Sequence, residues 1–190
     1  MIYQYDDEWR EEIIGGNAVM LASPTLNHNF VSGNIYRIFA NYLHGKRCTP
    51  FSDNTKLFLE DGEKYIPDMM VVCNPEKLKR NGVYGAPDLV VEVLSPGTAK
   101  NDRGHKKDIY EKHGVREYWI VSPGEQSVEQ YILKDGAFIL QELYTHYSPN
   151  MLADMTAEER NAVVTEFQCT LFTDLTIHLE DIFYRVTSGI

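Results

Sequence analysis

An almost unbroken apolar run, DLVVEVLS at residues 88–95, constrains the fold of this 190-residue chain most strongly. A strand that is apolar at nearly every position is typical of the centre of a sheet covered on both faces. The exception inside the run is Glu92. A buried carboxylate destabilises a protein unless it meets a cation, a metal ion or hydrogen-bond donors. Glu92 therefore predicts either an internal ion pair or a functional site.

The segments around this strand predict a mixed α/β domain. DRGHKKDIYEKHG (102–114) is typical of a helix that ends at Gly114, and REYWIVS (116–122) is typical of a strand. A helix between two such strands indicates a βαβ crossover. Residues 127–144 predict a hairpin that turns at Lys134-Asp135-Gly136.

The N-terminal half supplies the other expected elements. Apolar residues at helical spacing predict a helix, and Gly15-Gly16 predicts the turn of a hairpin. The expected elements are a short polar helix or lead-in (1–12), a hairpin (13–23), a turn with helix-cap residues (23–29), a helix (30–43), two strands (51–59 and 67–72) and a loop (74–87).

The C-terminal part is less regular, but no linker or repeat divides the chain, so we expect one domain over residues 1–190. We expect an insertion near 148–168, where Thr156 and Glu159 have the spacing of a helix capping box. The tail at 172–186 mixes helical and alternating patterns, and both states stay open there.

The net charge of −10 argues against a basic nucleic-acid-binding surface over the whole molecule. Local basic stretches occur at 76–82 and 100–108, so any DNA-binding surface is expected to be local. The acidic N-terminus and the lack of a long apolar run predict a cytoplasmic protein without a membrane span. Cys48, Cys73 and Cys169 are scattered, which favours reduced thiols over a disulfide framework.

Two acids could converge if their strands are neighbours. Asp68 begins the expected strand at 67–72, and Glu92 lies within the central strand. Their carboxylates, with the backbone carbonyl of Val93 and water, would suit Mg²⁺, which prefers hard oxygen ligands. Taken singly, Asp68 is also explained as a turn residue and Glu92 as half of a buried salt bridge.

The helix after Glu92 offers a candidate cation. Asp102, Lys106 and Tyr110 are spaced four residues apart and share one helical face. Lys106 could position a nucleophile or stabilise charge on a phosphate, although a solvated helix lysine is the simpler explanation for it alone. For His28, at a helix start, a role as a capping or hydrogen-bonded residue is a simpler explanation than a role as a ligand.

Several motifs resemble those of the Uma-type restriction endonuclease family, a branch of the PD-(D/E)XK nuclease superfamily. They are EIIGG (12–16), SPTLNHN (23–29), PDMMVV (67–72), APDLVVEVLSP (86–96), DRGHKKDIYEKHGVREYWIVSP (102–123) and LTIHLEDIF (175–183). The resemblance covers about residues 12–145 and the tail. It implies a restriction-endonuclease-like fold, with a central mixed β-sheet flanked by helices and an αβββαβ core.

The resemblance also implies roles for individual residues. Asp68 and Glu92 match the two family acids, but Leu94 stands where the superfamily motif has its lysine. Lys106 is then expected to take the role of that lysine from the following helix. The weaker supporting candidates are Glu12, His28, Asp102 and Tyr110.

The function implied is hydrolysis of DNA phosphodiester bonds by an endonuclease that uses Mg²⁺ or Mn²⁺, with a homodimer as one arrangement. The alternative is a catalytically inactive domain that keeps the fold and binds DNA or another protein, to which Leu94 and the acidic balance lend some weight. A nucleotide-binding Rossmann-type domain is disfavoured because no glycine-rich phosphate loop follows a strand.

Overall fold

The computed structural model describes residues 10–187, which form two six-stranded sheets, one two-stranded sheet, one long helix and several short helices. The helices are α1 (Leu26–Leu43), α2 (Ala99–Arg103), α3 (His105–Lys112), α4 (Pro149–Asp154), α5 (Ala157–Asn161) and α6 (Leu179–Ile182), with a 3-10 helix at Pro75–Lys77. The strands are β1 (Glu11–Ile14), β2 (Asn17–Met20), β3 (Thr49–Ser52), β4 (Leu57–Phe58), β5 (Lys64–Tyr65), β6 (Met69–Val72), β7 (Leu78–Lys79), β8 (Gly82–Tyr84), β9 (Leu89–Val93), β10 (Glu117–Ser122), β11 (Ser127–Lys134), β12 (Ala137–Thr145), β13 (Glu166–Gln168) and β14 (Thr176–His178).

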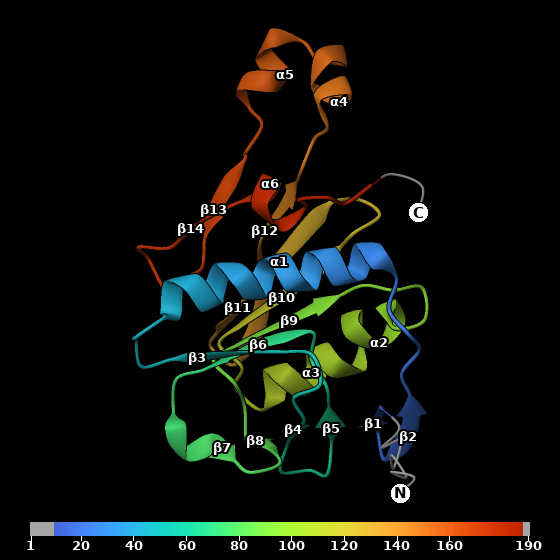
Figure 1. Cartoon of the computed structure of the whole chain (residues 1–190), viewed down its shortest axis with the longest axis vertical. Coiled ribbons are helices and arrows are strands. Elements are labelled where there is room, and N and C mark those ends of the chain that lie inside the picture. The colour runs from blue at the N-terminus through green and yellow to red at the C-terminus, as the bar shows by residue number, and fades with distance from the viewer. Residues whose placement is uncertain (1–9, 188–190) are drawn as a thin grey trace, which may run out of the picture.

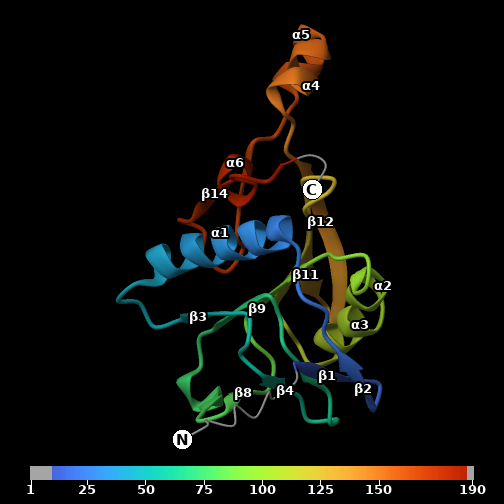
Figure 2. The same cartoon turned by 45° about the vertical axis from the view of Figure 1, so that its right-hand side comes forward.

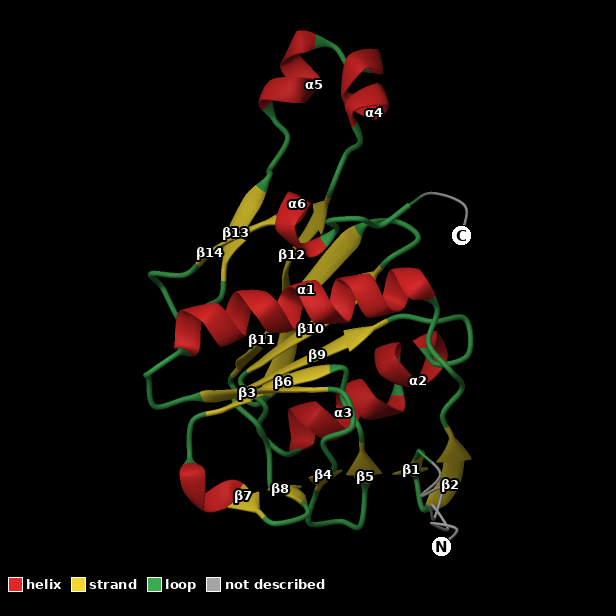
Figure 3. Ribbon diagram, viewed as in Figure 1, coloured by secondary structure: helices red, strands yellow, loops and turns green. Residues whose placement is uncertain are grey.

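The main sheet has the order β12-β11-β10-β9-β6-β3, and β9 lies inside it with every residue buried. Strands β9 and β10 are parallel and are joined through α2 and α3, which confirms the predicted crossover. The other neighbours are antiparallel, so the sheet is mixed. Helix α1 lies over one face of the sheet, and α2 and α3 lie on the other (Figure 1, Figure 3).

Side-chain alternation divides the buried residues into two cores, one on each face of the main sheet. Val91 and Val93 of β9 pack with α1 and the C-terminal segment. Val90 packs on the opposite side, with Tyr110 of α3 and residues of the second sheet. Because successive side chains of a strand point to opposite faces, Glu92 belongs to the same face as Val90. The alternation thus places Glu92 on the side of α3.

The second six-stranded sheet, β2-β1-β5-β4-β8-β7, was not predicted as a sheet. The expected strand at 51–59 is split into β3 and β4, the expected strand at 67–72 is preceded by the additional strand β5, and the expected loop at 74–87 contains β7 and β8. The β1–β2 hairpin is confirmed, but residues 11 and 12 form a strand and not a helix. The rest of the predicted lead-in, residues 1–9, lies outside the described residues.

The prediction of one continuous helix at 102–114 was wrong, because Gly104 separates α2 from α3. Gly104 has φ −113° and ψ −109°, which is not helical. A Cβ atom at this position would lie 2.9 Å from the carbonyl oxygen of Lys100, so the break favours glycine. Helix α1, by contrast, starts earlier than predicted, with its N-cap at Thr25.

The prediction that all three cysteines are reduced was wrong. Cys48 and Cys73 form a disulfide, while Cys169 is free and buried. The antiparallel pairing of β3 with β6 sets Thr49 opposite Val72 and leaves the two cysteines beside each other at the strand ends. The 25-residue separation of these cysteines hides this pairing in the sequence.

Helices α4 and α5 form an arm that stands away from the sheets (Figure 1, Figure 2). Neither helix has a buried residue, and α5 carries the predicted capping box of Thr156 and Glu159. The tail contains both a strand, β14, and a helix, α6. Within residues 10–187, no helix is both long and apolar enough to cross a membrane.

Candidate functional site

Strand pairing brings the two predicted acids together. In the antiparallel pair of β6 and β9, Met69 lies opposite Val91 and Met70 opposite Val90. Continued by one residue, this register sets Asp68 opposite Glu92 on the same face of the sheet. Directly opposed residues have Cβ atoms about 5 Å apart. The condition on which the sequence-based hypothesis depended, that the two strands are neighbours, is therefore met.

The Glu92 carboxylate is 4% exposed and is held by two residues of α3. Its Oε1 accepts a hydrogen bond of 2.7 Å from the hydroxyl of Tyr110 and one of 3.2 Å from Nζ of Lys106. Tyr110 is itself buried, and burial together with the charge of Glu92 raises the pKa of its hydroxyl. The Tyr110 hydroxyl therefore stays protonated and serves as a donor.

Lys106 is an ammonium surrounded by carboxylates. Its side chain is 3% exposed, and Nζ lies 2.9 Å from Glu12, 3.2 Å from Glu92 and 3.5 Å from Asp102. Glu12 also accepts a hydrogen bond from the backbone N–H of Ile66, which holds it in place. Glu12, a weaker candidate from the sequence, thus contacts Lys106 directly. Asp102 belongs to the same cluster and does not cap a helix.

In this cluster three carboxyl groups surround one ammonium group. Burial lowers the pKa of Lys106, but Glu92, Glu12 and Asp102 outweigh this effect and the net shift is upward. The pKa of Glu92 is raised well above its ordinary value by burial, against the effect of Lys106, and that of Asp102 is raised for the same reasons. The raised pKa keeps Lys106 protonated, and because three carboxyl groups surround it, the cluster can accommodate a further cation.

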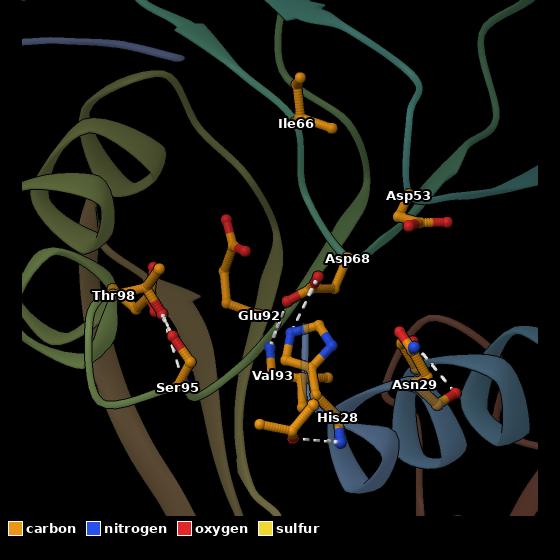
Figure 4. Close-up of polar contacts among 12 residues, drawn as sticks. His28, Asn29, Asp53, Ile66, Asp68, Glu92, Val93, Ser95 and Thr98 are labelled. Atoms are coloured by element: carbon orange, nitrogen blue, oxygen red, sulfur yellow. Dashed lines mark hydrogen bonds and ion pairs between the residues drawn. The ribbon is translucent and has the colours of Figure 1, made fainter. Parts of the chain in front are cut away.

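Asp68 is fixed at both oxygens (Figure 4). Its Oδ2 accepts a 2.7 Å hydrogen bond from the backbone N–H of Val93, and its Oδ1 lies 3.2 Å from Nε2 of His28. His28 comes from the first turn of α1, which Thr25 caps. Burial lowers the pKa of His28. Asp68, Asp53 and the nearby carbonyl of Val93 raise it by a larger amount, so the net shift is upward. His28 thus positions Asp68.

These residues line one cavity of about 260 Å³, which includes Glu12, His28, Asp68, Glu92, Asp102 and Lys106. Tyr110 supports Glu92 from behind and is not part of the lining. Asp88, which begins the second Pro-Asp stretch, is also elsewhere: its carboxylate accepts a hydrogen bond from the backbone N–H of Cys73. The structure therefore separates a site aspartate from a structural one.

Two cavity residues were missed by the sequence analysis. Arg10 and Asp53 form a 3.4 Å ion pair, and both line the cavity. No local motif marks either residue, because each reaches the site through strand pairing that is distant in sequence. Figure 4 shows Asp53 near Asp68, on the side of the cavity away from Ser95 and Thr98.

A second missed acid, Glu63, supports the site from outside. Its carboxylate accepts hydrogen bonds from the N–H of Gly15 and the hydroxyl of Tyr65, and it lies 3.1 Å from Nε2 of His105. Gly15 has φ +58°, which favours glycine. The EIIGG motif thus fixes the β1–β2 hairpin against α3 and helps to place Glu12, although the sequence alone did not reveal its partner.

The donor set of the cavity fits Mg²⁺ or Mn²⁺. Asp68, Glu92 and the Val93 carbonyl provide hard oxygen atoms, and Mg²⁺ typically uses one or two carboxylates and keeps several waters. The N–H of Val93 points at Asp68, so its carbonyl points to the same side of the strand. In addition, His28 Nδ1 is buried without a hydrogen-bond partner among residues 10–187, and the buried Asp102 Oδ1 makes a 3.5 Å ion pair with Lys106. An unsatisfied buried atom such as His28 Nδ1 indicates an additional ligand or water.

The site does not contain a larger preformed metal cluster. Among residues 10–187, no group of three or more His, Cys, Asp or Glu side chains is arranged to hold a metal ion. Two carboxylates with one carbonyl suit a weakly held, hydrated ion rather than a permanently bound one.

The mixed sheet flanked by helices has the fold of a restriction-endonuclease-like nuclease. A crystal structure from Anabaena variabilis, described as "a putative nuclease belonging to DUF820", superposes with a TM-score of 0.70 over 93% of this chain and 91% of that one. Sequence identity to it is 17%, so this likeness concerns the fold.

The family follows from the sequence comparison. The model of the Uma2 family, described as "Putative restriction endonuclease", matches residues 2–162, and the chain belongs to that family. Two curated Synechocystis proteins, both described as uncharacterized, are also similar. One, slr1290, is 30% identical over 136 residues, covering 70% of this chain and 72% of that protein. The other, sll1609, is 27% identical over 139 residues, covering 70% and 78%.

Proposed function

We propose that the protein is a metal-dependent DNA endonuclease that hydrolyses phosphodiester bonds. The family description and the nuclease fold support nuclease activity, while the substrate and the metal are part of this proposal. The observation that carries it is the convergence of Asp68, Glu92 and Lys106 on one cavity, from β6, β9 and α3.

Asp68, Glu92 and the Val93 carbonyl would hold Mg²⁺ or Mn²⁺. Such an ion lowers the pKa of water and neutralises phosphate charge. The chain itself supplies the positioning: Val93 N–H and His28 fix Asp68, and the Tyr110 hydroxyl fixes Glu92. Groups held in this way need little reorganisation when charge develops in the transition state.

Lys106 is suited to stabilise negative charge. Its raised pKa keeps it protonated, so it cannot act as a general base at neutral pH. Its three N–H groups face Glu12, Glu92 and Asp102. The Lys106 N–H that now donates to Glu92 would, once Glu92 holds a metal ion, donate to a phosphate oxygen or orient the attacking water. In this way Lys106 would take the role of the superfamily lysine, whose position is occupied by Leu94 in this chain.

Cleavage of plasmid DNA tests the proposal. Supercoiled, linear and single-stranded DNA would be incubated with the protein and Mg²⁺, Mn²⁺ or EDTA, with Glu92→Ala and Asp68→Ala as controls. We expect nicking or linearisation with either metal, none with EDTA and none with either variant. Equal cleavage by wild type and Glu92→Ala would show a contaminating nuclease and contradict the proposal.

The alternative function, a nuclease fold that binds without cleaving, has two supporting observations. No larger metal cluster is preformed among residues 10–187, and Leu94 replaces the expected lysine. Thermal unfolding with increasing Mg²⁺ separates the two functions. An endonuclease should be stabilised by the metal, and Asp68→Ala should lose this effect. Unchanged unfolding of both proteins, together with DNA binding but no cleavage, would favour the alternative.

The proposal includes a homodimer and a cytoplasmic location. Light scattering after size-exclusion chromatography would measure the assembly state. The disulfide of Cys48 and Cys73 is unusual for a reducing compartment. Thiol counting on freshly isolated protein would therefore test the location as well: one free thiol indicates the oxidised form, and three indicate the reduced form.

A further inference from the structure

A basic groove of about 400 Å³ lies beside the cavity and has no role in the site described so far. Its lining includes three cations, Lys56, Lys79 and Arg80, and no acid; the other lining residues are Phe51, Asn54, Thr55, Leu78, Asn81, Gly82 and Val83. A surface of this charge is unexpected on a chain with a net charge of −10. The concentration of positive charge indicates an anionic ligand.

Two cations of the groove, Lys79 and Arg80, present their side chains for binding. Lys79 and Arg80 are exposed, and neither side chain forms an ion pair or hydrogen bond with any residue in the range 10–187. The other basic stretch, at 100–108, differs in this respect. There Lys106 is buried among acids, and Arg103 lies 2.7 Å from Glu129. The structure thus distinguishes between the two basic stretches that the sequence indicated.

The groove has a fixed shape. Arg80 and Asn81 form the two-residue turn between β7 and β8, in which Lys79 pairs with Gly82. Gly82 has φ +152°, and a Cβ atom there would lie 2.3 Å from the carbonyl oxygen of Lys56. This close approach, which a side chain would prevent, holds the β7–β8 hairpin against the segment that carries Lys56.

The chain passes directly from the lining of the cavity to the lining of the groove. Asp53 lines the cavity, and Asn54 lines the groove. Consecutive Cα atoms lie about 3.8 Å apart, whereas successive base pairs of DNA rise about 3.4 Å. A strand that leaves the cavity would therefore reach the groove within a few nucleotides.

We infer that this groove binds backbone phosphates of the DNA strand that passes through the cavity, with Lys79 and Arg80 as the main contacts. The inference rests on the proposed nuclease function and adds the path of the substrate. Phosphate contacts position a nucleic acid without reading its sequence. Lys79 and Arg80 are accordingly binding residues and take no part in the chemistry.

Fluorescence anisotropy with a labelled DNA duplex tests the groove. Binding would be measured in EDTA, to prevent cleavage, over a series of NaCl concentrations. Lys79→Ala/Arg80→Ala should weaken binding at least about tenfold and reduce the slope of log affinity against log salt by about two, one for each lost phosphate contact. Lys79→Arg/Arg80→Lys should bind as wild type does.

Lys134→Ala/Arg160→Ala is the matched control. Both residues are exposed and lie on the β11–β12 hairpin and the arm, and the double variant changes the net charge equally. It should bind DNA almost as wild type does. If Lys79→Ala/Arg80→Ala matches this control in affinity and salt slope, the inference is overturned. An acidic protein would then be the better candidate ligand for the groove.

The inference and the proposed function can fail separately. If wild type cleaves DNA with metal and Lys79→Ala/Arg80→Ala binds DNA normally, only the inference about the groove is overturned. Loss of binding in that variant, with no cleavage by wild type, supports the groove and contradicts the nuclease. Absence of DNA binding by wild type, together with absence of metal-dependent cleavage, overturns both.

Discussion

Lys106 illustrates at the residue scale how stability and activity are linked in this site. The ammonium contacts Glu12, Glu92 and Asp102, and all four side chains are almost fully buried. Removing one partner from a buried ion pair leaves uncompensated charge, which is more costly than never burying the pair. Activity loss in a Lys106 variant alone would therefore not separate a catalytic from a structural role.

We expect Lys106→Met to lower the free energy of unfolding by about 3 to 5 kcal/mol in EDTA and to abolish cleavage. Lys106→Met/Glu12→Gln removes one acid together with the cation and should recover part of that stability. Its cleavage should remain absent if Lys106 acts on the substrate. Chemical denaturation and a plasmid assay would measure the two effects; recovery of cleavage in the double variant would contradict the role given to Lys106.

His28 acts on the site through Asp68. Loss of a partner that orients a metal ligand typically lowers metal affinity about 10- to 100-fold. His28→Ala should therefore raise the Mg²⁺ concentration needed for half-maximal cleavage at least about tenfold, with a smaller effect on the maximal rate. A lower maximal rate at unchanged Mg²⁺ dependence would instead indicate direct contact of His28 with substrate.

At the scale of the elements, the disulfide links the start of β3 to the end of β6. Closing a loop of about 25 residues stabilises a protein by roughly 3 kcal/mol, mainly through the unfolded state. Cys48→Ser/Cys73→Ser should therefore unfold at a lower temperature than oxidised wild type, with cleavage preserved. The disulfide joins the strand end remote from Asp68. If reducing agent leaves the unfolding temperature of wild type unchanged, the bond makes no contribution in solution.

Asp61 ties the β4–β5 turn to the end of α3. Its carboxylate accepts a 2.8 Å hydrogen bond from Lys112, and this contact and nearby His113 lower its pKa to about 2. A lowered pKa stabilises the fold above the unfolded-state value of about 3.9. This contribution is lost as the pH falls through about 2.

Asp61→Asn should accordingly lower stability at neutral pH by at most about 1 kcal/mol, as for other exposed ion pairs. The difference from wild type should shrink as the pH falls from about 4 toward 2. Urea unfolding of both proteins across this range would measure it. A difference that does not depend on pH would show that the ion pair is not its source.

At the scale of the whole molecule, elements with a local pattern could be predicted and contacts between distant strands could not. The apolar run containing Glu92 identified β9, and the helical spacing identified α1. Glu12 reaches Lys106 only because β1 pairs with β5, a contact between Ile13 and Lys64. The second sheet, Arg10, Asp53 and the disulfide depend on similar long-range pairing. The helical spacing of Asp102, Lys106 and Tyr110 made Lys106 a candidate, but only the family resemblance gave it a role, since nothing local distinguishes a buried helix lysine from a solvated one.

The arm formed by α4 and α5 should be dispensable for the site. Its helices have no buried residues and lie outside both cores. Replacing residues 149–163 with a short Gly-Ser linker should leave the unfolding temperature and the cleavage rate close to those of wild type. Loss of cleavage with an intact fold would show that the arm contributes to substrate binding or assembly.

The most direct test of the nuclease centre compares two buried glutamates on neighbouring strands. Glu92 lies in the cavity, whereas Glu117 of β10 accepts hydrogen bonds from Trp119, Gln130 and Thr170 and lies outside it. The measurement is the initial rate of Mg²⁺-dependent plasmid cleavage at a temperature where both Glu92→Gln and Glu117→Gln are folded. We predict loss of cleavage in Glu92→Gln and retention in Glu117→Gln. Cleavage by folded Glu92→Gln at the wild-type rate would contradict the assignment of the site.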